Sequence, residues 1–317
     1  MIEQTRVRFD SGGTACVGYL YRSAGAGTLR PCVVLAAGFA GTQDTPSIQA
    51  TARAFAAADL AALTFDYRNF GESEGIPRQV IEIKRQHDDI RAAVRFARGL
   101  AGIDPERVAL WGTSLGGGHV IAVAADDPRI AAVVAQVPFN GFPAKVEGRS
   151  AAATGRLLLV ALEDALRGWL GRPPRYIPAV GATGETAVMA TREARQAIEG
   201  MQSSHWRNEV APRALLEMMR YKPGEKARRV AIPVLVCIAE NDRETPPELA
   251  REIADAAPRG EFKSYPVAHF DFYRPEVRKM AIADQIAFLR RHLRLDVRTT
   301  GEEGRVSTGP PGTHERS

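Results

Sequence analysis

A five-residue motif in the first half of the chain could supply a reactive hydroxyl. Residues Gly112–Gly116 fit the pattern G-x-S-x-G, with Ser114 at its centre. An apolar run typical of a strand leads into the motif at 107–111, and a run typical of a helix follows it. The bend between them leaves no room for side chains two positions either side of the serine, and glycine satisfies this at both places. Ser114 would stand exposed at a helix N-terminus, where developing negative charge is favoured, and is the candidate nucleophile.

A serine nucleophile needs a base. In this strand-turn-helix arrangement the acid and then the histidine follow the serine, each on a loop after a later strand. The histidines beyond Ser114 are His119, His205, His269, His292 and His314. Among them only His269 follows a predicted strand, 261–265, and precedes the final predicted helix. His269 is therefore expected to take the Ser114 proton and to return it to the leaving group.

The acid is expected in the loop after the predicted strand 232–239. Three carboxylates compete there, namely Glu240, Asp242 and Glu244. A short side chain at Asp242 has the position needed to reach a histidine on the neighbouring loop, whereas the two glutamates are expected to be solvated. The earlier loop at 140–142 offers no acid. The sequence therefore predicts a catalytic triad of Ser114, Asp242 and His269.

Two backbone N–H groups must meet the negative oxygen that forms during acyl transfer. One is expected from Leu115, directly after the serine, and the other from the loop after the predicted strand 32–36. That loop is Gly38–Gly41, and Phe39 is its candidate donor. An ordinary glycine turn would look the same in sequence.

Strand and helix patterns alternate along most of the chain and would position these residues. The predicted strands are 5–10, 15–21, 32–36, 61–65, 107–111, 130–137, 232–239 and 261–265. The predicted helices between and after them are 48–58, 80–100, 116–125, 247–257 and 277–293. Strands that alternate with helices predict an α/β fold, in which a mostly parallel sheet carries helices on both faces.

The alternation stops after Phe139 and resumes at Ile232, and so long a connection needs structure of its own. Helical runs lie within it at 151–170, 192–201 and 212–221. The end of the chain holds hardly an apolar side chain. We therefore expect a core domain made of residues 1–140 and 229–295, a helical cap at 141–228, and a disordered tail at 296–317.

Composition excludes several classes of function. The net charge of +5 comes from acids and bases mixed along the chain, without a basic run or a stacking pattern that would indicate nucleic acid. The cysteines, Cys16, Cys32 and Cys237, lie singly in apolar stretches and indicate buried thiols rather than a metal site. Neither a signal peptide nor a membrane span is indicated. We expect a cytoplasmic protein, monomer or homodimer, that binds a small acyl substrate without cofactor, metal, nucleic acid or membrane.

Taken together, these residues resemble the α/β-hydrolase superfamily from Arg6 to Leu293. Besides the serine motif, the stretch 65–73 is similar to the D-x-R-x-x-G-x-S turn after the fourth strand, and His269 with the two residues after it is similar to the histidine loop. The resemblance implies an eight-stranded, mostly parallel sheet with flanking helices and an inserted helical cap. Within the superfamily the chain is similar to capped bacterial hydrolases near the dienelactone hydrolase and X-Pro dipeptidyl peptidase (S15-like) branches, and more weakly to fungal polyketide transferases.

One departure from the family pattern limits what the resemblance implies. Where many members have His-Gly before the oxyanion residue, this chain has Ala37-Gly38, so lipase-type substrate preferences do not follow. Asp66 and Arg68 are expected to hold a loop rather than to catalyse. Six apolar residues of the insertion region are candidates for the pocket lining or for the core of the cap: Phe139, Phe142, Trp169, Met189, Trp206 and Met218.

Three functions are compatible with this pattern. The first is hydrolysis of an ester, thioester or related acyl bond through an acyl-serine intermediate. The second is transfer of a polyketide-like acyl group to an alcohol or amine, with the same triad and a cap that excludes water. The third is a ligand-binding protein that keeps the fold without turnover.

Overall fold

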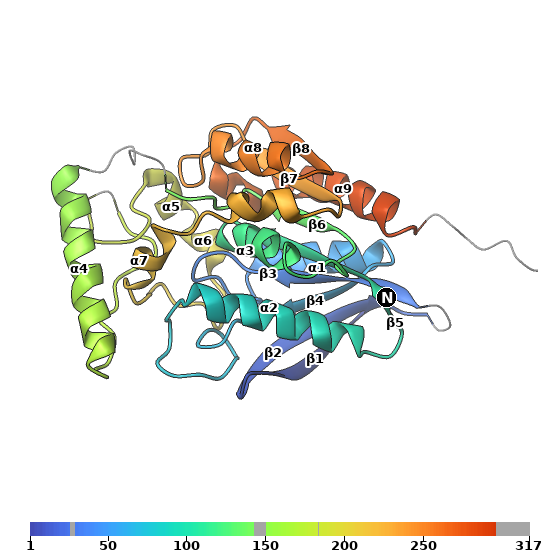
Figure 1. Ribbon diagram of the computed structural model, residues 1–317, viewed down its shortest axis with the longest axis horizontal. Helices are drawn as coiled ribbons and strands as arrows, with labels where there is room; N and C mark the ends of the chain where they lie inside the picture. The colour runs from blue at the N-terminus through green and yellow to red at the C-terminus, as the bar shows by residue number, and fades with distance from the viewer. Residues whose placement is uncertain (26–28, 143–149, 183, 296–317) are drawn as a thin grey trace, which may run out of the picture.

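An eight-stranded sheet forms the centre of the molecule, in the order β1-β2-β4-β3-β5-β6-β7-β8 (Figure 1). The computed structural model describes residues 1–25, 29–142, 150–182 and 184–295. The strands are β1 (Ile2–Ser11), β2 (Thr14–Ser23), β3 (Arg30–Ala36), β4 (Ala61–Phe65), β5 (Ile103–Thr113), β6 (Val133–Gln136), β7 (Val234–Ala239) and β8 (Gly260–Tyr265). This sheet confirms the expected fold class.

The strand directions explain the sequence patterns. Strand β2 pairs antiparallel with β1 and with β4, and the pairs from β4 to β8 are parallel. Strands β4, β6 and β7 are buried along their whole length. Because helices cover both faces of a parallel strand, its side chains are buried and mostly apolar. These segments are accordingly unbroken apolar runs in the sequence.

Helices cover both faces of the sheet (Figure 1). Helix α1 (Pro46–Ala57) packs with α9 (Pro275–His292) on one side. On the other side α2 (Ile83–Arg98) packs with α3 (Leu115–Ala124), and η1 (Pro223–Arg229) packs with both α3 and α8 (Pro247–Ala256). Burial of Gln86, Ile90, Ala93 and Ala97 along one face of α2 matches the helical period.

The segment between β6 and β7 gathers at one end of the sheet (Figure 1). It contains α4 (Ala151–Trp169), α5 (Arg192–Gln196), α6 (Ile198–Met201) and α7 (Ala214–Met218). Helix α4 is attached through Asp164, a fully buried carboxylate that accepts hydrogen bonds from the Arg213 guanidinium, the nearer at 2.6 Å, and from the backbone of Arg175 at 2.7 Å. A buried carboxylate paired in this way fixes the position of the helix.

Some element limits differ from those expected. Strand β6 is four residues long and ends before Val137, whose φ of 38° leaves the strand region of the backbone. The helical run at 192–201 is two short helices, α5 and α6, that meet at Ala197. The expected disordered tail, 296–317, lies outside the described residues. No helix of the described part is long and apolar enough to cross a membrane.

Candidate active site

Ser114 lies in a strained turn between β5 and α3. Its φ of 54° and ψ of −122° lie outside the regions that side chains other than glycine usually adopt. A Cβ at Gly112 would come within 2.3 Å of the Gly116 carbonyl oxygen, and a Cβ at Gly116 within 2.3 Å of the Ala37 carbonyl oxygen. Both glycines of the motif are therefore required by backbone contacts at the turn.

Backbone hydrogen bonds hold Ser114 in this conformation. Its N–H donates to the Gln136 carbonyl at 2.9 Å, at the end of the neighbouring strand β6. Its own carbonyl accepts from Gly118 at 3.1 Å and from Phe139 at 2.9 Å. The surrounding structure thus fixes the strained conformation, as is typical of residues that carry function.

His269 and Asp242 are in direct contact. The distance between His269 Nδ1 and an Asp242 carboxylate oxygen is 2.7 Å, and both side chains are buried. The other Asp242 oxygen accepts backbone N–H groups of Glu244 at 2.8 Å and Thr245 at 2.7 Å. The competing Glu240 is exposed, and Glu244 accepts a hydrogen bond from the hydroxyl of Thr191. Of the three carboxylates, Asp242 is the one that reaches the histidine.

Thr245 is a residue of this site that the sequence reasoning missed. Its hydroxyl lies 2.9 Å from the same Asp242 oxygen that contacts the histidine, 3.2 Å from His269 Nδ1 and 3.1 Å from the Val137 carbonyl. A signal was available, because an Asp followed after three residues by Thr and then Pro is typical of a side-chain turn that precedes a helix. Thr245 ties the acid to the histidine and to the end of β6.

The electrostatic surroundings of His269 favour its charged form. Burial alone would lower its pKa, but the Asp242 carboxylate, its hydrogen bond and the charge of Glu244 outweigh burial, so the pKa is raised above 6.5. The Asp242 contact occupies Nδ1, which leaves Nε2 as the ring nitrogen available to another group. In its neutral form His269 can therefore accept a proton at Nε2, and its raised pKa makes it a stronger base.

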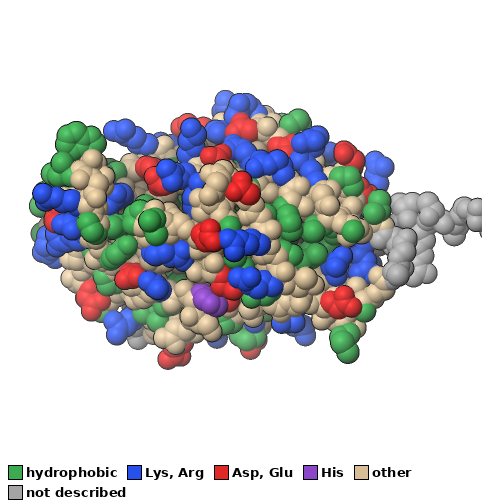
Figure 2. All heavy atoms as spheres, turned by 90° about the horizontal axis from the view of Figure 1, so that it is seen from below, with side chains coloured by type: hydrophobic (Ala, Val, Ile, Leu, Met, Phe, Trp, Pro, Cys, Tyr) green, Lys and Arg blue, Asp and Glu red, His purple; other side chains and the backbone are tan. Residues whose placement is uncertain are grey.

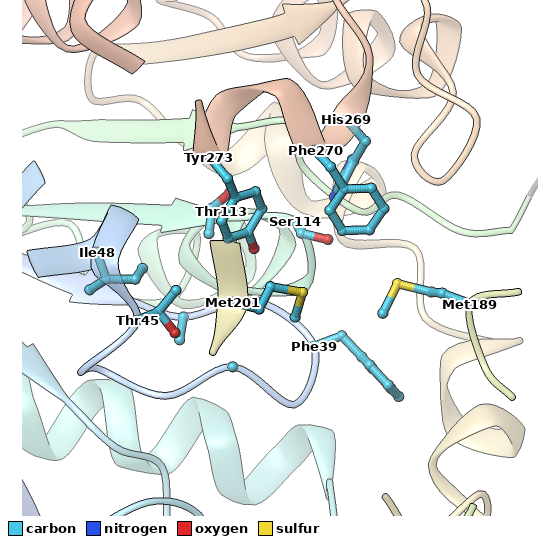
Figure 3. Close-up of a pocket in the computed structure, with 13 residues that line it drawn as sticks. Phe39, Thr45, Ile48, Thr113, Ser114, Met189, Met201, His269, Phe270 and Tyr273 are labelled. Atoms are coloured by element: carbon cyan, nitrogen blue, oxygen red, sulfur yellow. The ribbon is translucent and has the colours of Figure 1, made fainter. Parts of the chain in front are cut away.

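Ser114, His269 and Phe39 line one pocket, which Figure 3 shows. The described structure has no direct hydrogen bond between the Ser114 hydroxyl and the imidazole, and such contacts commonly tighten only when substrate binds. The other residues of the lining are Ala37, Gly38, Gly41, Thr45, Ile48, Thr113, Met189, Met201, Phe270 and Tyr273. Strands and loops far apart in the sequence thus bring the candidate nucleophile and base to one pocket with both polar and apolar walls.

The two candidate oxyanion donors belong to two segments that adjoin the serine, the start of α3 and the turn after β3. Leu115 is the first residue of α3, so its N–H has no acceptor within the helix. Phe39 lies in a turn closed by a 3.1 Å bond from Gly41 N–H to the Gly38 carbonyl. A Cβ at Gly38 would meet the Ser114 Cβ at 3.2 Å, so this turn lies against the serine. Within the described chain neither donor N–H has a recorded acceptor.

The six apolar candidates for pocket lining or cap core mostly lie away from the pocket. Of the six candidates only Met189 lines the pocket. Trp169 is 81% exposed on the outer side of α4, while Phe139 and Met218 are buried in the core. The side chains that were missed include Met201 from α6 and Tyr273 from η2 (His269–Tyr273). The Tyr273 hydroxyl points into the pocket in Figure 3, and burial raises the pKa of this phenol to about 12.

The other histidines of the chain lie elsewhere. His119, within α3, contacts His87, Tyr221 and Gln86 in a buried cluster. His205 contacts Asp44, and His292 contacts Glu261 near the surface. His314 lies outside the described residues. None of the described ones lines the Ser114 pocket.

Asp66 and Arg68 hold backbone segments together, as expected. Asp66 accepts hydrogen bonds from the backbone N–H of Gln43 at 2.9 Å and of Glu72 at 2.9 Å, and burial raises its pKa to about 6. Arg68 pairs with the buried Asp89, with 2.6 Å between guanidinium nitrogen and carboxylate oxygen, and donates to the Ser11 carbonyl at 3.0 Å. Neither residue lines the Ser114 pocket.

The sheet order and the strained serine turn define an α/β hydrolase. The chain belongs to the family described as serine aminopeptidase, S33, whose model matches residues 27–271, and it is an enzyme of the hydrolase class. The expected superfamily membership is thus confirmed.

Three similar proteins extend this result. The chain is 40% identical to the quorum-quenching protein AidA of Acinetobacter baumannii (strain MDR-ZJ06) over 288 residues, 90% of this chain and 94% of that protein. It is 28% identical to polyketide transferase ATR5 of Stachybotrys chlorohalonatus (strain IBT 40285) over 291 residues, 89% and 95% of the two chains. The solved structure of α/β hydrolase GrgF from Penicillium sp. sh18 has a TM-score of 0.77 at 22% identity, over 92% of this chain and 99% of that one, and shows the shared fold.

Proposed function

We propose that the chain cleaves an ester, thioester or related acyl bond through an acyl intermediate on Ser114. One observation carries this proposal. Ser114 shares a pocket with His269, and Asp242 lies 2.7 Å from the Nδ1 atom of that imidazole. A strained, half-buried serine in one pocket with a buried and carboxylate-bound imidazole has the parts that covalent acyl transfer needs.

In the proposed mechanism His269 Nε2 takes the Ser114 proton as the serine oxygen bonds to the acyl carbon. The bond from that carbon to the leaving oxygen or sulfur then breaks, and the proton passes from His269 to the leaving group. A water gives its proton to His269, attacks the acyl-serine and releases the acid, and the serine regains its proton. The N–H groups of Phe39 and Leu115 donate hydrogen bonds to the negative oxygen during both acylation and deacylation. The Asp242 carboxylate stabilises the imidazolium that forms in each step.

Acyl transfer is the second candidate, and one observation favours it. Met189 and Met201 reach the pocket from the segment 141–228, which we propose to be a cap, so part of the wall over Ser114 is apolar. An apolar cover that keeps water from the acyl-serine lets an alcohol or amine accept the acyl group instead. The relative ATR5 is named a polyketide transferase, which supports including this reaction.

The test is turnover of linear esters, thioesters and a lactone over a series of acyl chain lengths, by wild type and by Ser114→Ala. Labelling with a fluorophosphonate probe, followed by peptide mass spectrometry, locates the reactive serine. We expect the label on Ser114 and no turnover by the alanine variant. A folded wild type that takes no label would support a ligand-binding protein instead, and turnover retained by Ser114→Ala would rule out the covalent mechanism.

Product analysis separates the two enzymatic candidates. Wild type is given a substrate that it turns over, together with an increasing concentration of a small alcohol. Hydrolysis gives the free acid at every alcohol concentration. Acyl transfer gives a new ester whose share of product rises with alcohol while the rate of leaving-group release is maintained.

A further inference from the structure

Helix α4 has two apolar faces, and the described elements cover one of them. The inner face, with Leu157, Ala161 and Asp164, is buried on the side of α7. Figure 1 places α4 at the outer edge of the molecule, with α5 and α7 on its inner side. Its outer face is turned away from the rest of the described chain.

The outer face carries a regular apolar stripe. Gly155, Leu159, Leu162, Leu166 and Trp169 follow one another at alternating steps of four and three residues, the spacing of a seam between paired helices. Leu159 is 67% exposed and Trp169 81% exposed. A Cβ at Gly155 would meet nothing within 4 Å, so the helix backbone there is open to a neighbour.

The exposed area is large for a surface that meets only water. Leu158 and Leu170 flank the stripe. These two leucines, and each leucine and the tryptophan of the stripe, are individually between 39% and 81% exposed. Multiplying the full surface area of each of these leucines and of the tryptophan by its exposed fraction gives an exposed area on the order of 700 Å². This area is close to the ~800 Å² that each partner contributes to a standard interface. The largest apolar patch of a typical monomer covers roughly 300–600 Å². Figure 2 shows hydrophobic side chains at the outer tip of the end that carries α4.

We propose that this stripe pairs with α4 of a second copy of the chain, antiparallel across a two-fold axis. The axis passes at Leu162, which meets its own counterpart. Leu159 then packs on Leu166 of the other copy, and Trp169 lies over the open backbone at Gly155. Each large side chain meets a small or medium one, whereas a parallel pair would stack tryptophan on tryptophan and glycine on glycine.

A second copy fits this face better than a membrane surface does. Membrane-bound helices present a wide apolar face bordered by cations. Here the cations that α4 carries outside its inner face, Arg156 and Arg167, lie along one flank of the stripe together with Glu163, which forms an ion pair with Arg175. The self-matching order of the stripe satisfies the requirement that both sides of a two-fold contact use the same surface. The proposal does not depend on the catalytic one.

Cross-linking tests the geometry directly. The native cysteines Cys16, Cys32 and Cys237 are buried, so a new surface thiol is the reactive one. Leu162→Cys is expected to form a disulfide-linked dimer under mild oxidation, because the axis brings the two thiols together. Lys279→Cys, exposed on α9 away from α4, is the matched control and is expected to stay monomeric in denaturing gels. Equal cross-linking of the two variants would overturn the proposal.

Sedimentation equilibrium of the full chain tests the assembly. Wild type and Leu29→Arg, an exposed leucine elsewhere, are expected to sediment as dimers, and Leu162→Arg as a monomer with an unchanged circular dichroism spectrum. Because Leu162 is exposed, its substitution leaves the fold intact. A wild type that is monomeric at every concentration overturns the proposal. So does a monomer that co-sediments with anionic lipid vesicles through the same stripe, since the occupant is then a membrane.

Discussion

In the described part of the chain, buried histidines lie at the Ser114 pocket and between α2 and α3, and the two places differ in the partner that each imidazole has. His269 contacts a carboxylate, Asp242, at 2.7 Å. His87 and His119 contact each other at 3.1 Å and share the Tyr221 hydroxyl at 2.9 Å. Figure 3 shows His269 at the pocket, whereas His87 and His119 contact each other between α2 and α3.

The difference appears in the pKa values. Burial, with the nearby Arg91, lowers the pKa of His87 to about 4, and burial lowers the pKa of His119 well below its usual value. The carboxylate reverses this effect at His269, whose pKa is raised. Burial alone therefore makes an imidazole a neutral structural group, and an adjacent carboxylate makes it a base that can hold a proton.

Replacing His269 by alanine gives the largest expected loss. Without the imidazole the Ser114 hydroxyl has no proton acceptor, so kcat should fall by roughly 10⁶-fold, as for other triads. The measurement is kcat on the best ester of the substrate series, with Ser114→Ala as a comparison. The two single variants and the double variant should be about equal. Additive losses in the double variant would show that the two side chains act separately.

Asp242→Asn is expected to lose about 10⁴-fold in kcat, because the imidazole is then held in the wrong tautomer. It also tests the pKa comparison. In wild type the acid limb of kcat/KM should have its midpoint above pH 6.5, because a raised pKa leaves less neutral imidazole as the pH falls. The asparagine removes the charge and the carboxylate hydrogen bond of Asp242, the two largest causes that raise the His269 pKa, and leaves burial with the smaller effect of Glu244, so the midpoint should move downward. An unchanged midpoint would show that the Asp242 carboxylate does not raise the pKa of His269.

Thr245→Val should have an intermediate effect. It removes the hydroxyl that lies 2.9 Å from Asp242 and 3.2 Å from His269, and one such hydrogen bond is worth about tenfold in kcat/KM. Thr245→Ser keeps the hydroxyl and should restore most of the activity. Because a purely structural role would leave the acid limb of the pH profile in place, a shifted midpoint in the valine variant identifies a positioning role. The account fails here if serine and valine behave alike.

Tyr221→Phe should have the smallest effect on catalysis and a clear effect on stability. It removes the hydroxyl shared by His87 and His119, whose ring nitrogens still contact each other, and the loss of such a buried hydrogen bond costs about 0.5–1.5 kcal/mol in the free energy of unfolding. Urea unfolding measures this loss, while kcat/KM of the folded variant should stay within roughly twofold. A large drop in kcat/KM without a change in stability would place the second cluster in the mechanism.

Features set by local chain geometry could be predicted from the sequence. A Cβ at Gly112 or Gly116 would lie 2.3 Å from a backbone oxygen, so both positions require glycine and the motif can be recognised from the sequence alone. The fully buried strands β4 and β7 appear as unbroken apolar runs for the same reason. The order of acid and histidine after the serine follows from the direction of the strands. Asp242 and His269 accordingly meet, although their catalytic roles stay predictions.

Features set by the fold of the insertion could not be predicted. Trp169 and Met201 are both apolar residues of helical runs, yet one is 81% exposed and the other lines the pocket. Helix α4 has two apolar faces, and its sequence does not say which of them is inward. Tyr273 was missed because it reaches the pocket from the short helix after His269, whose backbone course depends on its packing.

The rate of fluorophosphonate labelling at Ser114, measured across pH by peptide mass spectrometry, tests most directly whether His269 activates the serine. We predict that wild type labels at Ser114 with an acid midpoint above pH 6.5, and that His269→Ala labels orders of magnitude more slowly at every pH. Equal labelling rates in the two proteins, or a label found only at another residue, would contradict the account.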